Sequence, residues 1–364
     1  MTNQNQPLYL QIRTFLRNKI ETGELKPGDQ IPVEAELAQQ FNVSRITIKS
    51  ALKMLVDEGL VYRTAGRGTF VSDPQRPAAL EPAGPDNYRK IGLIGPMTSD
   101  SYTLGLLRSI EDQCKEQNLI MLFRSAVTQS EEKEAIRILR SQGVEGLIIF
   151  PADGEAYSQA ILDLKTEGFP FVLIDRYLPG IKTNAVVSDN FQGGYLGTEY
   201  LVNKGHRQIG IVSGTKSKTA SSEDRFSGYL EAARKTGLKI EPLHWLTRID
   251  EISYHEEQPT RDMIRDWLNG QQELTAVFAF GSAMAVYVAE IAVQLGKRVP
   301  EDLAILSFDT PNIRDFQGLY FSRIEQQEER IGVSAVELLL QVIADPSIIE
   351  RIVIPVSLVE GRST

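Results

Sequence analysis

Three basic side chains recur at four-residue intervals near the N-terminus: Arg45, Lys49 and Lys53. On an α-helix such positions share one face, so the three cations would project together. The two arms of an arginine guanidinium can donate to O6 and N7 of guanine, which contributes about 1–3 kcal/mol of base discrimination. The spacing therefore indicates a helix that reads the major groove of DNA, with a solvated cationic face as the alternative.

The residues before this stripe predict two helices that would support it. Apolar residues at helical spacing predict a first helix over residues 8–20, with Pro7 at its start. A turn is expected over residues 23–31. A second helix is expected to begin near Pro32, because proline suits the first helical position.

The stripe itself lies on a third predicted helix, which ends at Gly59. Ser44 suits its N-cap, where the hydroxyl oxygen accepts a free backbone N–H. The apolar residues that this helix turns inward are Ile48, Ala51, Leu52, Leu55 and Val56. Two short strands are expected over residues 60–63 and 68–72. Between them Arg67 is flanked by glycines, so the backbone there can approach a phosphate or enter a minor groove.

Residues 7–73 resemble the winged helix-turn-helix domain of GntR-type transcriptional regulators. The matching segments are PLYLQI at 7–12, GELKPGDQIPVEAELAQQFNVSRITIKSALKMLVDEGLVYR at 23–63 and GRGTFV at 66–71. The resemblance implies, position by position, that the major groove faces Glu34, Arg45, Thr47 and Lys49, and that the tip of the wing is formed by Gly66, Arg67 and Gly68. Ser44, the expected N-cap, completes the expected DNA-binding residues. Near DNA, the Glu34 carboxylate would accept from a cytosine amino group, orient Arg45 or hold a helix N-terminus.

A proline-rich segment follows this unit. Residues 72–85 read SDPQRPAALEPAGP, with four prolines and little apolar content. Because proline fixes φ and lacks an N–H, an extended and semi-rigid linker is expected. The 364-residue chain is thus expected to divide into a DNA-binding domain over 1–73, a linker over 74–88 and a larger domain over 89–364.

From Arg89 onward, short apolar runs alternate with amphipathic stretches. This alternation predicts an α/β fold with parallel sheets and helical crossovers, and the number of elements predicts two lobes. The apolar runs lie at residues 91–94, 119–123, 147–150, 171–174, 209–212, 276–280 and 303–308.

Polar residues that follow these runs are candidates for a ligand cleft, because open α/β sheets bind ligands at the carboxyl ends of their strands. They are Asp175, Arg176, Asp309, residues 99–103, Arg225 at a helix start, and the pair Gly281-Ser282. Carboxylates and arginines suit a polyhydroxylated ligand, whose hydroxyls both donate and accept hydrogen bonds. The aromatic rings that could stack on a sugar are Tyr102, Tyr177, Phe280 and Phe308, although core packing is the commoner role of such a ring.

Residues 89–364 are similar to the effector domain of LacI/GalR-type regulators, which resembles periplasmic sugar-binding proteins. The similarity rests on the segments FPFVLIDRYLPGIKTNAVVSDNFQGGYLGTEYLVNKGHRQIGIVSG (169–214), EDRFSGYLEAARKTGL (223–238), RVPEDLAILSFD (298–309) and SRIEQQEERIGVSAVELLL (322–340). By position, the resemblance implies effector contacts at Asp175 or Arg176, Arg225, Asp309 and Gln326. Together with the candidates from the strand ends, the expected effector-binding residues are Tyr102, Asp175, Arg176, Arg225, Phe280, Ser282, Asp309 and Gln326. In that family Asn-Asp usually stands where this chain has Gly281-Ser282, so an unusual ligand or pose is expected. The combined build resembles regulators of the arabinose-repressor type, with a winged helix-turn-helix joined to a two-lobed periplasmic-binding-protein-like α/β domain.

Catalysis finds little support in the sequence. The three histidines lie outside metal-ligand spacings, and neither a nucleophile-elbow motif nor a phosphate-loop motif occurs. The single cysteine, Cys114, excludes an intrachain disulfide and a cysteine-ligated zinc cluster. We therefore expect no metal, no cofactor and no enzyme; Asp175 and Asp309 would be the one plausible acid–base couple.

The charge and the hydropathy of the chain limit the classes of partner that it can bind. The formal net charge is −9, yet residues 1–73 hold nine basic and eight acidic side chains, so the acidic excess belongs to the rest of the chain. This excess argues against non-specific polyanion binding without excluding a local basic face. Neither a run of 18 apolar residues nor a signal-peptide pattern occurs, so a cytoplasmic protein without membrane contact is expected.

The sequence therefore predicts a ligand-responsive transcriptional regulator, namely a repressor of carbohydrate-use genes that a sugar or sugar derivative releases from its operator. Two chains are expected to pair as a homodimer on double-stranded operator DNA. An activator, or a repressor that needs its ligand as corepressor, is the alternative of the same build. The alternatives from other classes are an enzyme with a fused DNA-binding head and a sugar-storing or transport-linked binding protein.

Overall fold

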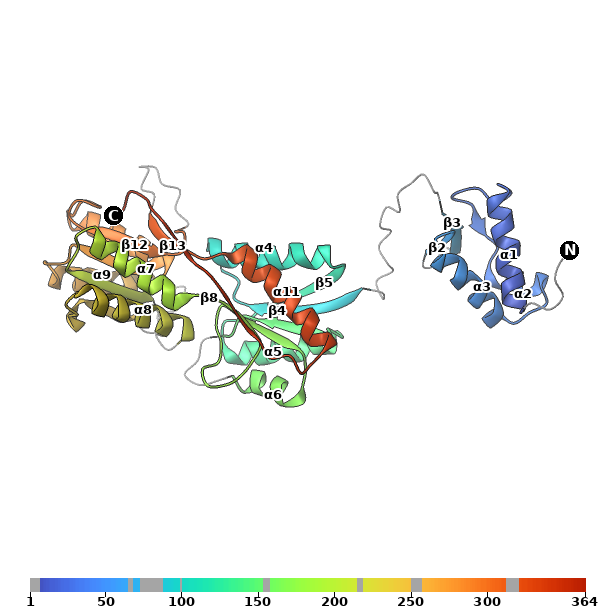
Figure 1. Cartoon of the computed structure of the whole chain (residues 1–364), viewed down its shortest axis with the longest axis horizontal. Coiled ribbons are helices and arrows are strands. Elements are labelled where there is room, and N and C mark those ends of the chain that lie inside the picture. The colour runs from blue at the N-terminus through green and yellow to red at the C-terminus, as the bar shows by residue number, and fades with distance from the viewer. Residues whose placement is uncertain are drawn as a thin grey trace. The chain divides into compact units, whose positions relative to one another are not determined.

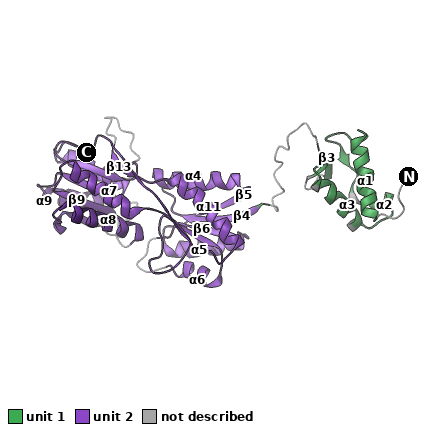
Figure 2. Cartoon of the chain, viewed as in Figure 1, with its two compact units in different colours: residues 1–88 green, residues 89–364 purple. Residues whose placement is uncertain are grey.

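The computed structural model describes residues 7–64, 68–72, 88–98, 100–152, 158–214, 219–249, 257–311 and 321–364. The chain divides into two compact units, Met1–Tyr88 and Arg89–Thr364, which we call unit 1 and unit 2 (Figure 2). All of the expected linker except Tyr88 lies outside the described residues, as do the wing-tip residues Gly66 and Arg67.

Unit 1 contains the expected three helices and a small antiparallel sheet. The sheet has the strand order β1-β3-β2, so the hairpin of β2 and β3 is extended by β1. Its elements are α1 (Leu8–Glu21), β1 (Gln30–Ile31), α2 (Glu34–Gln40), α3 (Arg45–Asp57), β2 (Val61–Thr64) and β3 (Gly68–Val71).

Three local expectations for unit 1 are wrong. The second helix begins at Glu34, with Val33 at its N-cap, rather than near Pro32; residues 30 and 31 pair with β3 instead of completing a turn. Val56, expected in the core, is 36% exposed, whereas Leu55 is fully buried. At 100° per residue, Val56 lies at the edge of the face that Ile48 and Leu55 bury.

The first lobe of unit 2 is a parallel six-stranded sheet with the order β14-β8-β7-β6-β4-β5. Its helices cover both faces: α4 and α11 lie on one side, and α5 and α6 on the other (Figure 1). These elements are β4 (Arg89–Gly95), α4 (Ser101–Glu116), β5 (Leu119–Ser125), α5 (Gln129–Ser141), β6 (Gly146–Ile149), α6 (Gln159–Glu167), β7 (Phe171–Ile174), β8 (Ala185–Ser188), α11 (Glu328–Ala344) and β14 (Arg351–Ile354).

The second lobe has a six-stranded sheet of order β10-β9-β11-β12-β13-β15, parallel except for the pair β13–β15. The helices of this lobe pack against its sheet through two separate clusters of buried apolar residues. Its elements are α7 (Asn190–Asn203), β9 (Ile209–Gly214), α8 (Ala220–Thr236), η1 (Pro242–His244), β10 (Trp245–Ile249), α9 (Glu257–Gly270), β11 (Ala276–Ala279), α10 (Ser282–Gln294), β12 (Ala304–Phe308), β13 (Ser322–Glu325) and β15 (Ser357–Val359).

The chain crosses between the lobes three times, after β8, after β13 and after β14. Because both sheets are built mainly of parallel strands, the carboxyl ends of those strands form the edges where ligands bind in such folds. Among the helices described, none is both long enough and apolar enough to cross a bilayer.

Candidate functional site

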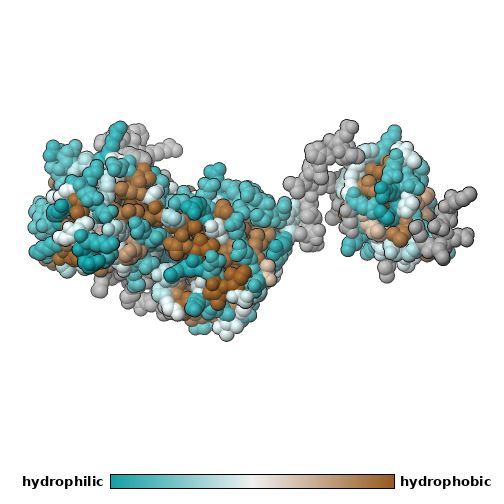
Figure 3. Space-filling view, in the orientation of Figure 1, coloured by the Kyte–Doolittle hydropathy of each residue, from teal (hydrophilic) through white to brown (hydrophobic). Residues whose placement is uncertain are grey.

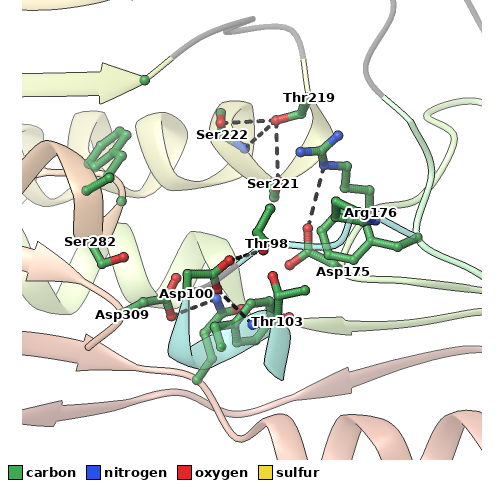
Figure 4. Close-up of a pocket in the computed structure, with 18 of the residues that line it drawn as sticks. Thr98, Asp100, Thr103, Asp175, Arg176, Thr219, Ser221, Ser222, Ser282 and Asp309 are labelled. Atoms are coloured by element: carbon green, nitrogen blue, oxygen red, sulfur yellow. Dashed lines mark hydrogen bonds and ion pairs between the residues drawn. The ribbon is translucent and has the colours of Figure 1, made fainter. Parts of the chain in front are cut away.

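A cavity of about 420 Å³ lies where the carboxyl ends of strands from both lobes meet (Figure 4). The first lobe contributes residues that follow β4, β6 and β7, and the second lobe contributes residues that follow β9, β11, β12 and β13. The wall includes all eight side chains that the sequence predicts for effector binding: Tyr102, Asp175, Arg176, Arg225, Phe280, Ser282, Asp309 and Gln326. The structure thus brings this set together, while its ligand-binding role remains a prediction.

Two aspartates of the wall have left-handed backbones. Asp175 has a φ of 65° directly after β7, and Asp309 has a φ of 69° directly after β12. Aspartate tolerates this region better than most residues, and such conformations concentrate at ligand sites. Each turn ends a buried strand and presents one carboxylate to the cavity, one from each lobe.

Arg225, in the second turn of α8, is the most enclosed cation of the wall, with 8% of its surface exposed. Its Nε donates to Oδ1 of Asn190 at 2.7 Å, and one terminal nitrogen donates to the carbonyl of Phe280 at 2.7 Å. The guanidinium carbon lies 3.5 Å from the centre of the Phe308 ring. Burial lowers the pKa of Arg225, and the nearby carboxylates of Asp309 and Asp175 oppose this effect.

The expectation that Phe308 and Tyr177 could stack on a sugar is wrong. Phe308 is fully buried, because Arg225 covers one face and α7 packs close to its ring at Gly193. Tyr177 is absent from the described cavity wall, and its hydroxyl donates to Asp224 at 3.2 Å. Of the four aromatic candidates, only Tyr102 and Phe280 line the cavity.

The carboxyl group of Asp309 accepts a hydrogen bond from Nε2 of Gln326 at 2.8 Å. Burial raises the pKa of Asp309 to about 6, against the lowering effects of Arg225 and Gln326. Oε1 of Gln326 is buried and has no hydrogen-bond partner among the described residues. Burial also raises the pKa of Tyr102, and the carboxylates of Asp175 and Asp309 add to this effect. The cavity therefore offers acceptors that need donors from a guest molecule.

Arg176 lies beside Asp175 on the first-lobe side of the cavity (Figure 4). Its Nε is 3.6 Å from a carboxylate oxygen of Asp175, and a terminal nitrogen donates to the carbonyl of Pro151 at 3.2 Å. Its guanidinium carbon is 5.2 Å from the centre of the Phe150 ring. Asp100 caps α4 nearby by accepting from the amide of Thr103 at 2.8 Å, and it also bonds Thr98.

Sequence reasoning missed a group of hydroxyls at the start of α8, formed by Thr219, Ser221 and Ser222. Thr219 caps the helix through the amide of Ser222, and all three residues line the cavity (Figure 4). The signal was present, because applying the strand-end rule to β9 would have pointed to Ser213 and to the helix that follows.

The pair that departs from the LacI/GalR pattern, Gly281-Ser282, begins α10 at the cavity. Gly281 is the N-cap, and its lack of a side chain leaves this helix end without a side-chain cap. A Cβ at Gly281 would meet no heavy atom within 4 Å, so the wall is open at this point.

The basic face of unit 1 is built as the spacing predicts. The hydroxyl of Ser44 accepts from the amide of Thr47 at 3.2 Å and caps α3. The inward residues Ile48, Ala51, Leu52 and Leu55 are each at most 1% exposed. The side chains of Arg45, Lys49 and Lys53 are all exposed.

The structure describes the positions of some, but not all, of the other predicted DNA-binding residues. Thr47 is half-buried on α3, and Glu34 is the first residue of α2. Gly68 begins β3 with a φ of 121°, a conformation that favours glycine. Gly66 and Arg67 lie outside the described residues.

Within the part of the chain that the structure describes, no group of three or more His, Cys, Asp or Glu side chains could hold a metal ion. Two family descriptions match the chain. Residues 8–71 match the bacterial regulatory proteins of the gntR family, and residues 198–364 match the periplasmic binding protein-like domain. The chain joins a gntR-family regulatory domain to a periplasmic-binding-protein-like domain.

Relatives extend this regulator's similarity over nearly its whole length. It is 29% identical over 355 residues to the arabinose metabolism transcriptional repressor of Geobacillus stearothermophilus, covering 96% of this chain and 94% of that protein. It is 29% identical over 319 residues to the HTH-type transcriptional repressor PurR of Pasteurella multocida, covering 83% and 93%. A LacI family regulator from Enterococcus faecium, solved with bound ribose, superposes with a TM-score of 0.63 at 26% identity and covers 76% of this chain and 98% of that one.

These matches confirm the fold class and the combination of domains predicted from the sequence. The regulator is a ligand-responsive, DNA-binding transcriptional regulator and not an enzyme, because its relatives over most of its length are transcriptional regulators. The enzyme alternative is therefore wrong.

Proposed function

We propose that the regulator is a repressor that binds operator DNA through α3 and releases it when a neutral, polyhydroxylated molecule fills the cavity of unit 2. The observation that carries this proposal is the cavity wall, where carboxylates, a guanidinium, an amide and hydroxyls converge from both lobes. The relatives named as repressors support repression as the result of DNA binding.

The balance of donors and acceptors favours a sugar. Asp309, Asp175 and Oε1 of Gln326 accept, Arg225 donates, and Tyr102 can do both. Each sugar hydroxyl also donates and accepts, so it can pair with either kind of group. The ring of Phe280, also in the wall, offers an apolar face to sugar C–H groups. A pentose is the first candidate, because one relative is named for arabinose and one solved neighbour holds ribose.

For DNA, we propose that Arg45 and Lys49 face the major groove, with Ser44 and Thr47 at the helix start and Glu34 and the wing residues Gly66, Arg67 and Gly68 nearby. The exposed cations at the N-terminal end of α3 support this role, since helix-turn-helix proteins contact base edges with the first residues of the recognition helix.

Two chains are proposed to pair through unit 2, so that each chain places its helix α3 in one half-site of the operator. Hydrophobic residues lie among hydrophilic ones on the face of unit 2 that Figure 3 displays. Pairing through this unit would cover exposed apolar side chains such as Leu104 on α4, at 46%, or Val293 on α10, at 62%.

A thermal-shift screen tests the ligand class. The full-length protein is heated with L-arabinose, D-ribose, D-xylose or cellobiose, and glycerol at equal concentration is the control. A true ligand at 100 times its Kd stabilises the folded state by about 2.7 kcal/mol. A sugar that raises the Tm supports the proposal, whereas a panel that leaves the Tm unchanged contradicts it. If the bound sugar strengthens operator binding instead, the corepressor alternative is correct.

A further inference from the structure

Arg225 contacts more than the cavity. Through Nε it reaches Asn190, the first residue of α7, which is 3% exposed and is not among the described residues of the cavity wall. Because Nε of arginine can only donate, the facing amide atom must be Oδ1. The amide nitrogen Nδ2 of Asn190 then donates to the carbonyl of Ser188 at 3.2 Å.

This bond spans a crossing between the lobes. Ser188 is the last residue of β8 in the first lobe, and Asn190 begins α7 in the second lobe. The side chain of Asn190 therefore joins a cavity residue of one lobe to the backbone of the other. A hydrogen bond also joins this crossing to the one that follows β14, because the amide of Asp189 donates to the carbonyl of Ile354 at 2.8 Å.

The helices α7 and α8 pack so closely that their backbones touch. A Cβ at Gly194 of α7 would lie 1.9 Å from the carbonyl oxygen of Arg225, and one at Gly228 of α8 would lie 2.0 Å from that of Phe191. Such contact leaves no room for sliding between the two helices. If this packing is kept when the angle between the lobes changes, the crossing before α7 has to adjust, and the Asn190–Ser188 bond lies there.

We propose that Asn190 is a positioning residue that couples occupation of the cavity to the angle between the lobes, by joining Arg225 to the carbonyl of Ser188. The proposal rests on the proposed function, in which a bound sugar contacts Arg225. The guanidinium is planar and rigid, so a ligand that reorients its cavity-facing arms also reorients the Nε–H that Asn190 accepts. The hydrogen-bonded group of Arg225, Asn190 and Ser188 then has two arrangements, and each arrangement corresponds to one lobe angle. The ligand favours one of them, and coupling between two sites requires such a two-state element.

The substitution Asn190→Asp removes one of the two hydrogen bonds of Asn190 and keeps the other. The carboxylate keeps an acceptor for Arg225 but has no donor for Ser188, while its size is unchanged. Asn190→Ala removes both bonds. Thr198→Val is the matched control, because it deletes a buried hydroxyl on the same helix that donates to the carbonyl of Gly194, one turn away on that helix, at 2.8 Å.

Each full-length variant is tested for L-arabinose and D-ribose affinity by calorimetry. Its affinity for a labelled duplex from the gene's own promoter region is measured with and without saturating sugar. Allosteric coupling between two sites typically changes affinity about 5- to 150-fold. We expect Asn190→Asp to keep sugar affinity within about threefold of wild type while the sugar-dependent change in operator affinity falls at least about fivefold.

Thr198→Val should retain the wild-type response. A wild-type response in Asn190→Asp, or an equal loss in Thr198→Val, overturns the proposal for Asn190 alone. If neither sugar changes operator affinity in the wild type, the proposed function fails and this inference falls with it.

Discussion

Replacing Asp309 by asparagine should make the ligand-free regulator more stable while removing its response to sugar. The pKa of Asp309 rises from 3.8 to about 6 because burial disfavours the charged carboxylate. That difference corresponds to about 3 kcal/mol spent on holding the charge in the fold at pH values above 6. Asparagine keeps an oxygen for Nε2 of Gln326 and carries no charge, so it avoids this cost.

The effect has a defined pH window. A carboxyl whose pKa is raised in the folded state stabilises that state fully below the unfolded value, and this contribution is lost as the pH rises through about 6. The advantage of Asp309→Asn over wild type should therefore be about 1 kcal/mol at pH 4.5 and about 3 kcal/mol at pH 7.5. At pH 7.5 this corresponds to a Tm rise of roughly 5–10 °C for a domain of this size.

Thermal unfolding of both proteins between pH 4.5 and 7.5, with and without sugar, measures this directly. Asp302→Asn is the control with the opposite sign. Hydrogen bonds from Arg298 hold the pKa of Asp302 well below its usual range, so this carboxylate stabilises the folded state at every pH tested. The asparagine variant should therefore be less stable than wild type by an amount that stays nearly constant between pH 4.5 and 7.5. A Tm difference for Asp309→Asn that is flat across pH, or negative at pH 7.5, would refute the reasoning. A full sugar-induced Tm rise in this variant would refute the binding role of Asp309.

Three further substitutions test individual parts. Arg45→Ala should weaken operator binding by about 1–3 kcal/mol, measured by fluorescence anisotropy, and Arg108→Ala on the exposed surface of α4 should leave it unchanged. Ser44→Ala removes the cap of α3 and should lower the free energy of unfolding of unit 1 by about 1 kcal/mol in urea titrations; an unchanged midpoint would contradict the cap. Gly194→Ala places a Cβ 1.9 Å from a backbone oxygen and should cost about 1–3 kcal/mol or more, whereas Gly270→Ala, with nothing within 4 Å, should be tolerated.

Local signals predicted unit 1 well. Ser44 as a cap and the inward face of α3 follow from spacing that involves only neighbours along one helix, and the structure has both. The errors arose where the spacing allowed two choices. Val56 follows Leu55 directly, and packing against the other helices decided which of the two is buried.

The cavity was predictable because its residues obey a rule of topology. Asp175 and Asp309 follow apolar strands, and parallel strands bring their carboxyl ends to common edges. The rule does not say on which side of the strand a ring will lie. Phe308 ends β12 but turns towards α7, so Arg225 covers it instead of a ligand.

The position of Asn190 was beyond sequence reasoning for a different reason. Its contact with Arg225 joins residues 35 positions apart in the chain. An asparagine at a helix start is explained locally as a turn or cap residue, so nothing in the sequence marks it as a bridge. Only the close approach of α7 to α8 brings the two side chains together.

The most direct test of the account is the anisotropy of a labelled promoter duplex titrated with the full-length regulator at constant salt, with and without the sugar that most raises its Tm. We predict that the saturating sugar raises the operator Kd about 5- to 150-fold. An operator Kd that stays the same while calorimetry shows the sugar bound to the protein would contradict the claim that the cavity of unit 2 controls the DNA-binding helix of unit 1.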